Sequence, residues 1–304
     1  MFTSSSLSTL KNLLPWFQKN LYNDILNFLI DDWSYINNHN NKSRKIMFKY
    51  AKIGRAVLII QLLGAYFTFI PLIGRSIRQS NDGHNNDTIT ARKVPFIPEC
   101  WIPVTMPLNL YVGFYIIFCI ALFTMCTSFV GSDALFFTIA LHICGQFQIL
   151  YNSMENIRHN QLLVMLKNFE EICNKIIFFA VLGNVFLSCT TGFILLQSFD
   201  ISQGQIEWSL IARIFLLFVQ LFSYSYIGEE LTNRAGNIQS VIYNSNWDDL
   251  SPKIIKDMAF IIARSQYEFH LTAGKMQNMS IANFKDIVKA IFSYLSVLRL
   301  MFQK

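Results

Sequence analysis

Charged side chains are scarce in this sequence. Asp, Glu, Lys and Arg make up 14% of the 304 residues, whereas a soluble domain usually carries about 25%. No run of Lys and Arg alternates with aromatic residues, so nucleic acid is a poor candidate partner. Because 53% of the residues are apolar and the mean hydropathy is +0.35, a bundle of membrane helices explains the chain better than soluble domains do.

The motifs of catalysis and metal binding are missing as well. The sequence has no Walker A loop and no HExxH, GxSxG or DFG set. Its five histidines do not pair at metal-ligand spacing, and its six cysteines form no CxxC motif. We therefore expect no enzymatic activity, metal or cofactor. His142 lies on an apolar helical face, where a hydrogen-bonded core histidine is expected, and Cys100 lies in a loop, where its pairing stays open.

Long apolar segments are what the sequence does contain. Four of them reach the roughly 20 residues that a membrane-spanning helix needs, and a fifth at the C-terminal end is apolar but for four charged residues. The five predicted spans are residues 56–74, 108–130, 176–199, 208–228 and 284–303. Amphipathic patterns predict cytoplasmic helical segments at about 134–175 and 229–280. The expected fold is an all-α polytopic membrane bundle, a single domain over residues 1–304.

The distribution of basic residues predicts how this bundle crosses the bilayer. Eighteen Lys and Arg fall in the segments that lie on the same side of the membrane as the N-terminus, and four fall in the loops on the opposite side. Because basic residues favour the cytoplasm, the N-terminus is placed inside and the C-terminus outside. The expected location of this multi-pass protein is the plasma membrane. Asn86 begins a glycosylation sequon in the loop that this topology places outside, which gives weak support.

Four sets of residues, in chain order, resemble one family. The first is Asp32-Trp33, Ile46-Met47, Tyr50-Ala51 and Gly54-Arg55, just before a span. The second is Asp133, Leu135, Phe136, His142, Gln146 and Leu150. The third is Gly228, Leu231, Tyr243 and Trp247, with Ala235 where the family has Ser. The fourth is Phe284, Ser293-Tyr294, Leu298 and Arg299, with Val297 where the family has Leu.

Together these sets are similar to the insect odorant receptor family, whose members are seven-helix odorant-gated cation channels. The resemblance covers essentially the whole chain, but the Asp32-Trp33 pair normally follows the family's second span. We therefore expect this chain to correspond to the third to seventh spans, as in a short gene model, a splice form or a degraded gene. The resemblance implies an olfactory receptor subunit that joins the shared odorant co-receptor in a heterotetramer, in the dendritic membrane of sensory neurons.

The resemblance also implies a pocket for small volatile ligands in the outer half of the bundle. Aromatic walls with a few hydroxyls suit such ligands, and the tyrosines supply the polar handle. The candidate ligand-binding residues are Tyr66, Phe67, Ile70, Tyr111, Phe114, Tyr115, Phe118, Ile211, Phe215 and Phe218. For any one of them, packing or lipid contact is an equally good explanation.

The last predicted span has two unlike faces. Lys285, Lys289, Ser293 and Ser296 step along one side, and Ile287, Ile291, Leu295, Leu298 and Phe302 run along another. A helix with these faces suits the wall of a wet pore, so Lys289, Ser293 and Ser296 are candidate pore-lining residues. A cationic stripe is unexpected in a cation pore, so we expect the lysines to pair with Asp286 or with neighbouring subunits.

Three other classes of protein stay open at this point. A multi-pass transporter is expected to show internal repeats or paired broken spans, and neither is seen. A fragment of a G-protein-coupled receptor usually carries Asp-Arg-Tyr and Asn-Pro-x-x-Tyr, and both are missing. A truncated receptor product without activity is the third alternative.

Overall fold

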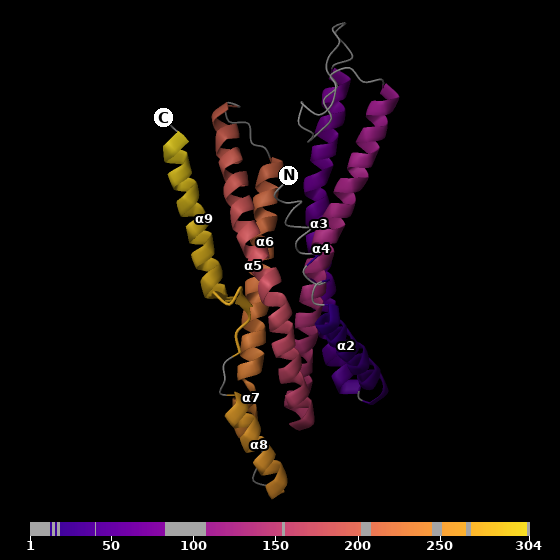
Figure 1. The fold of residues 1–304 in the computed structure, drawn as a ribbon, viewed down its shortest axis with the longest axis vertical. Helices are drawn as coiled ribbons and strands as arrows, with labels where there is room; N and C mark the ends of the chain where they lie inside the picture. Colours follow the sequence, from indigo (N-terminus) through magenta and orange to yellow (C-terminus); the bar gives the residue numbers. More distant parts are fainter. Residues whose placement is uncertain are drawn as a thin grey trace.

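The computed structural model describes Leu13, Trp16 and residues 19–39, 41–82, 108–153, 156–201, 208–244, 251–265 and 269–302. The long helices and the last helix of the chain run side by side (Figure 1). The helices are α2 (Lys19–His39), α3 (Asn41–Asp82), α4 (Leu108–Ser153), α5 (Asn156–Ile201), α6 (Trp208–Gly236), α7 (Ile238–Tyr243), α8 (Pro252–Ser265) and α9 (Ile281–Phe302). The prediction of an all-α bundle is confirmed.

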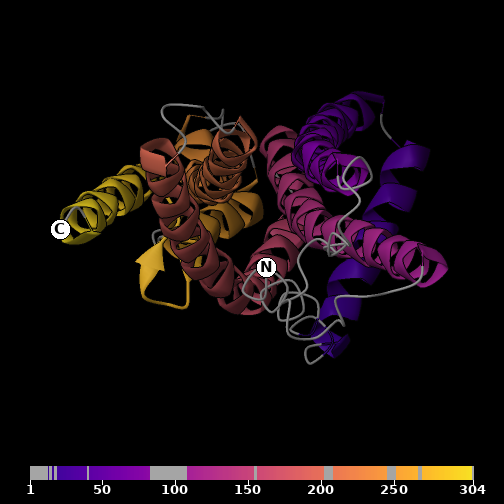
Figure 2. The same ribbon diagram turned by 90° about the horizontal axis from the view of Figure 1, so that it is seen from above.

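The long helices continue past the ends of the predicted spans. α4 runs unbroken through the predicted boundary near residue 130, and α5 begins in a predicted cytoplasmic segment and continues into a predicted span. Seen from above, α3 and α4 form one pair, while α5, α6 and α9 group on the other side (Figure 2). α7 and α8 lie at the end of the molecule opposite the C-terminus (Figure 1).

Three helices are long and apolar enough to cross a membrane, as far as the described residues extend. They are Val112–Leu150, Val164–Ser198 and Trp208–Tyr243, and each covers most or all of one predicted span. The first predicted span continues past Phe67, beyond which side chains in α3 are not described. α9 does not qualify because Lys285, Asp286 and Lys289 lie in its first half and Arg299 lies near its end.

The buried core lies in the end of the bundle that the sequence predicts to be cytoplasmic. It includes Phe137, Phe147, Phe169 and Leu231, each at most 1% exposed. In the most apolar stretch of α4, by contrast, only 6% of the residues are buried. Apolar side chains that face outward on one half and inward on the other fit a helix that leaves lipid for a packed protein body.

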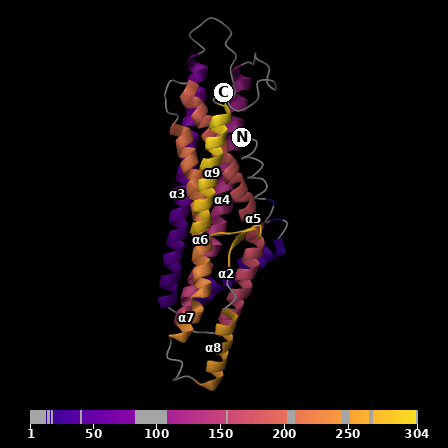
Figure 3. The same ribbon diagram turned by 90° about the vertical axis from the view of Figure 1, so that its left-hand side faces the viewer.

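A short β-hairpin connects this core to α9 and interrupts the predicted helical segment 229–280. β1 (Thr272–Ala273) pairs antiparallel with β2 (Gln277–Asn278). Gly274 and Lys275 both have positive φ, at 61° and 59°. A left-handed conformation at two successive residues forms a tight hairpin turn and ends any helix, which the apolar periodicity alone did not reveal. Figure 3 shows the hairpin beside α5, just before α9 begins.

α2 packs on the same core, close to α5. Ile25 is 2% exposed, and the partly buried ring of Tyr22 packs beside it. Burial, with a smaller contribution from the nearby Cys173, raises the pKa of Tyr22 to about 12. The phenol is therefore neutral at physiological pH and behaves as part of the apolar contact.

Candidate functional site

A cavity of about 510 Å³ lies between α5, α6 and α9. This volume falls within the range of about 300–1,000 Å³ that is typical of small-molecule sites. We call it the α9 cavity. Its lining residues are Ser188, Gly192, Leu195 and Leu196 of α5, Ile211, Ile214, Phe215 and Phe218 of α6, and Ile291, Phe292, Leu295, Ser296 and Arg299 of α9.

The walls of the α9 cavity are mostly apolar. The rings of Phe218 and Phe292 stack across α6 and α9, with centroids 6.1 Å apart. Gly192 allows α5 to approach α9 closely, because a Cβ there would lie 2.8 Å from Cδ1 of Leu295. Such walls favour an apolar ligand with aromatic or branched groups.

Few polar groups line the cavity. Ser188 is buried at 2% exposed, whereas Arg299 is exposed. The hydroxyl of Ser296 donates to the carbonyl oxygen of Phe292 in its own helix, at 2.9 Å. A hydroxyl that already donates can still accept, so the cavity suits a ligand with one hydrogen-bonding group.

The structure divides the predicted ligand-binding residues between two places. Ile211, Phe215 and Phe218 line the α9 cavity. Those on α3 and α4 do not line it: Tyr66 stacks on Phe123 with centroids 5.2 Å apart, and Phe67 is 67% exposed. Phe114 is exposed, and Tyr115 and Phe118 are half-buried on α4. The side chains of Ile70 and Tyr111, together with Asn86 and Cys100, lie outside the described residues.

Sequence reasoning missed the contribution of α5 to this cavity. No α5 residue was predicted to bind ligand, yet Ser188, Gly192, Leu195 and Leu196 line it. A signal was present, because Ser188 and Gly192 are small residues four apart within an apolar span and so share a helical face. Small residues on one face let a neighbouring helix approach or leave a hollow.

The two faces of α9 lie as the sequence predicts. Ile287 and Ile291 are buried against the bundle, at 9% and 1% exposed. The predicted pore-lining residues Lys289, Ser293 and Ser296 are all exposed, and Ser296 also borders the α9 cavity. The ammonium of Lys289 lies 3.7 Å from the carboxylate of Asp286, as expected for one of the two lysines.

Contacts from α6 hold the start of α9 in place. Oε2 of Glu229 accepts a hydrogen bond from the backbone N–H of Ile281 at 2.7 Å. A carboxylate at a helix N-terminus also favours the helix dipole. The hydroxyl of Ser280 accepts from the N–H of Asn283 at 3.2 Å, as an N-cap residue does. Gly228 lies against the hairpin, because a Cβ there would be 2.4 Å from the carbonyl oxygen of Met279.

Buried polar residues of the family-like sets hold the core together. Asp133 is 2% exposed and accepts hydrogen bonds from the side-chain amide of Gln220 and the hydroxyl of Tyr224. Nε2 of His142 lies 3.2 Å from Oδ2 of Asp32, in the Asp32-Trp33 pair. The prediction that His142 is a hydrogen-bonded core residue is confirmed, since it is 4% exposed.

Comparisons with known proteins agree on one family. A family model described as 7tm Odorant receptor matches residues 1–160 and 157–292. Odorant receptor 83a of Drosophila melanogaster is 24% identical over 143 residues, which are 47% of this chain and 32% of that protein. Odorant receptor 10 of Aedes albopictus is 23% identical over 142 residues, which are 46% of this chain and 37% of that protein. These matches span about a third of each relative's length.

A solved structure has the same fold. The insect olfactory receptor OR5 from Machilis hrabei, in complex with eugenol, aligns with a TM-score of 0.74 at 10% sequence identity. The alignment covers 98% of this chain and 80% of that one.

Proposed function

Since this chain belongs to the insect odorant receptor family, we propose that it is a subunit of an odorant-gated cation channel and binds small volatile ligands in the α9 cavity. The observation that carries this proposal is that the cavity is walled partly by α9, the helix with an exposed polar stripe. A ligand there contacts the element that would line a pore. The solved receptor with eugenol, a small phenol, supports the class of ligand.

Gating follows from the position of the α9 cavity. A ligand shifts a conformational equilibrium only if it binds one state more tightly than the other. The cavity walls come from three helices, so moving α9 changes the distance between Phe292 of α9 and Phe218 of α6. A ligand that fits the open arrangement of these rings favours an open pore lined by Lys289, Ser293 and Ser296.

The proposal includes assembly with the odorant co-receptor into a heterotetramer in the plasma membrane of olfactory neurons. α9 leaves apolar side chains exposed, including Leu300 at 71% and Met301 at 69%. In the assembled channel, this exposed apolar face of α9 contacts either lipid or neighbouring subunits. We expect odorant-evoked cation current when the full-length receptor is expressed with the co-receptor, and none from this chain without the co-receptor.

The test fills the cavity. Leu196→Trp places a bulky ring among the lining residues, so we expect ligand potency to fall at least tenfold in co-receptor-expressing cells. The control is Ile194→Trp, because Ile194 lies on the other face of α5 and is 51% exposed. Surface labelling confirms equal expression. Equal losses in both variants would contradict a ligand site in the α9 cavity, and a silent receptor at normal surface density would support the inactive product instead.

A further inference from the structure

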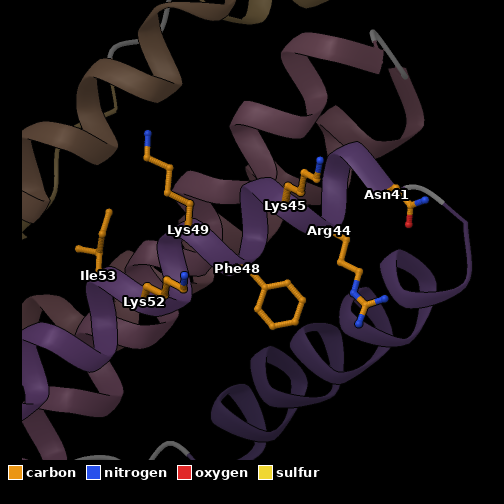
Figure 4. Close-up of a pocket in the computed structure, with 7 residues that line it drawn as sticks. All are labelled: Asn41, Arg44, Lys45, Phe48, Lys49, Lys52 and Ile53. Carbon is orange, nitrogen blue, oxygen red and sulfur yellow. The ribbon is translucent and has the colours of Figure 1, made fainter.

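A second hollow of about 720 Å³ lies along the N-terminal part of α3, far from the α9 cavity in the chain (Figure 4). We call it the basic groove. Its charged lining residues are Arg44, Lys45, Lys49 and Lys52, and the exposed side chains of Phe48 and Ile53 lie between them. These positions form two adjoining stripes of the helix, one of Arg44, Phe48 and Lys52 and one of Lys45, Lys49 and Ile53, whose members are four residues apart.

The cations of the basic groove lack acidic partners among the described residues. None of the ion pairs described there involves Arg44, Lys45, Lys49 or Lys52. Arg44 instead lies over the ring of Phe48, with its guanidinium carbon 5.5 Å from the ring centroid. Four exposed cations with no ion pair within the described part of the chain attract an anion.

The groove comes immediately before an apolar run. Residues 56–74 carry no charge, and Arg55 directly precedes them. Clusters of Lys and Arg next to a span on the cytoplasmic side attract anionic lipids. We propose that the basic groove binds the phosphorylated headgroup of an anionic lipid in the cytoplasmic leaflet, an inference that rests on the predicted inside location of the N-terminus and is independent of ligand binding in the α9 cavity.

The distance of each cation from the start of the apolar run indicates which kind of headgroup reaches it. At a rise of about 1.5 Å per residue, Lys52 lies roughly 6 Å below the start of the apolar run, Lys49 about 10 Å and Lys45 about 16 Å. The polar interface of one leaflet is only about 5–8 Å thick. Ordinary lipid phosphates therefore reach Lys52, whereas Lys49 and Lys45 require phosphates on a headgroup that projects into water. A phosphorylated inositol ring has this shape.

The groove also touches the core. The ring of Phe48 packs edge-on against Trp33, with centroids 5.9 Å apart, and Trp33 in turn lies 6.2 Å from the ring of His142. A lipid held at Phe48 therefore adjoins residues that fasten α2 to α4. We expect occupancy of the groove to stabilise the folded chain, because a ligand that binds only the folded state raises the unfolding midpoint.

The experiment measures thermal unfolding of the purified full chain in neutral detergent. The probes are a dioctanoyl phosphatidylinositol bisphosphate, the matching phosphatidylcholine and free inositol trisphosphate. We expect the bisphosphate lipid to raise the midpoint in a saturable way and the phosphatidylcholine to leave it unchanged. Because each cation near a membrane contributes about 1 kcal/mol, Lys45→Gln with Lys49→Gln should weaken the apparent affinity roughly thirtyfold.

Matched variants make the outcome decisive. Lys167→Gln with Lys175→Gln removes the same charge from exposed positions of α5 outside the groove, and should leave the affinity unchanged. Lys45→Arg with Lys49→Arg should restore binding. Equal losses in the two Gln pairs, or no shift with the bisphosphate lipid, would mean that the basic residues only orient the chain in the membrane. If free inositol trisphosphate raised the unfolding midpoint as much as the bisphosphate lipid does, the groove would be a site for a soluble phosphate, and the proposal of a lipid ligand would be wrong.

Discussion

Single buried polar residues connect the helices at the packed end of this bundle. Asp133 lies within α4 and accepts hydrogen bonds from two residues of α6, Gln220 and Tyr224. Both donors are themselves buried, at 7% and 0% exposed. A buried donor that loses its acceptor pays the full cost of its own desolvation. Asp133 therefore fastens α4 to α6 in a way that an apolar residue of the same size does not.

Asp133→Asn tests this role. The amide group has one acceptor oxygen, and its NH₂ group faces a side chain that also donates, so we expect a loss of about 2–3 kcal/mol in the free energy of unfolding. Thermal unfolding in detergent measures it. Asp286→Asn is the control, because Asp286 has 69% side-chain exposure and makes only a surface pair with Lys289, worth about 0–1 kcal/mol. A similar loss of unfolding free energy in both variants would contradict the proposed role of Asp133.

At the scale of elements, α9 is held from one end. Glu229 of α6 accepts from the first N–H of α9, the hairpin packs on α6 at Gly228, and the N–H of Gly274 donates to the carbonyl oxygen of Asn174 in α5 at 2.9 Å. Beyond these contacts, α9 packs through its apolar stripe, which includes Ile287 and Ile291, and through the ring of Phe292, which stacks on Phe218 of α6. A helix fixed at its base and packed on one side is suited to pivot around that base.

Gly228→Ala tests the close approach of α6 and the hairpin. A new Cβ would lie 2.4 Å from a backbone oxygen, which cannot rotate away. We expect a destabilisation of about 1–3 kcal/mol and faster hydrogen exchange at the N–H of Ile281. Gly131→Ala in α4 meets nothing within 4 Å, and Ala is the better helix former by up to about 1 kcal/mol. The two variants should therefore shift the unfolding midpoint in opposite directions, and a neutral Gly228→Ala would show that the hairpin moves freely.

At the scale of the whole molecule, packing changes along the bundle axis. The core fills the half that contains α7, α8 and the hairpin, whereas the other half exposes large apolar side chains such as Ile117 and Phe215. Such exposure is costly in water and favourable in lipid. The predicted orientation adds to this division that the packed half is cytoplasmic and the free end of α9 is outside.

Cysteine labelling on intact cells tests that orientation. Leu300 near the end of α9 and Met276 at the hairpin turn are 71% and 83% exposed. We expect a membrane-impermeant maleimide to label the Leu300→Cys variant in intact cells, and the Met276→Cys variant only after permeabilisation. The unmodified chain gives the background from its own cysteines. Labelling of the Met276→Cys variant in intact cells would show that the topology is the reverse of the predicted one. It would then also place the basic groove outside.

The sequence by itself determined the features that depend on composition and periodicity. The scarcity of charge predicted a helical membrane bundle, and the two stripes of α9 predicted which face is buried, because residues three or four apart always share a side of a helix. The apolar neighbours of His142 likewise predicted its place in the core. These are local properties of the chain, and the structure confirms them.

Only the tertiary structure decided which faces meet. Ser188 and Gly192 of α5 line the α9 cavity together with Phe218 of α6 and Leu295 of α9, and no spacing within one helix encodes that arrangement. The pairing of Asp133 with Tyr224 joins residues 91 positions apart. The hairpin depends on two successive positive φ values, one of them at a lysine. Cavities, distant hydrogen bonds and tight turns arise from how whole helices pack, which a linear pattern does not contain.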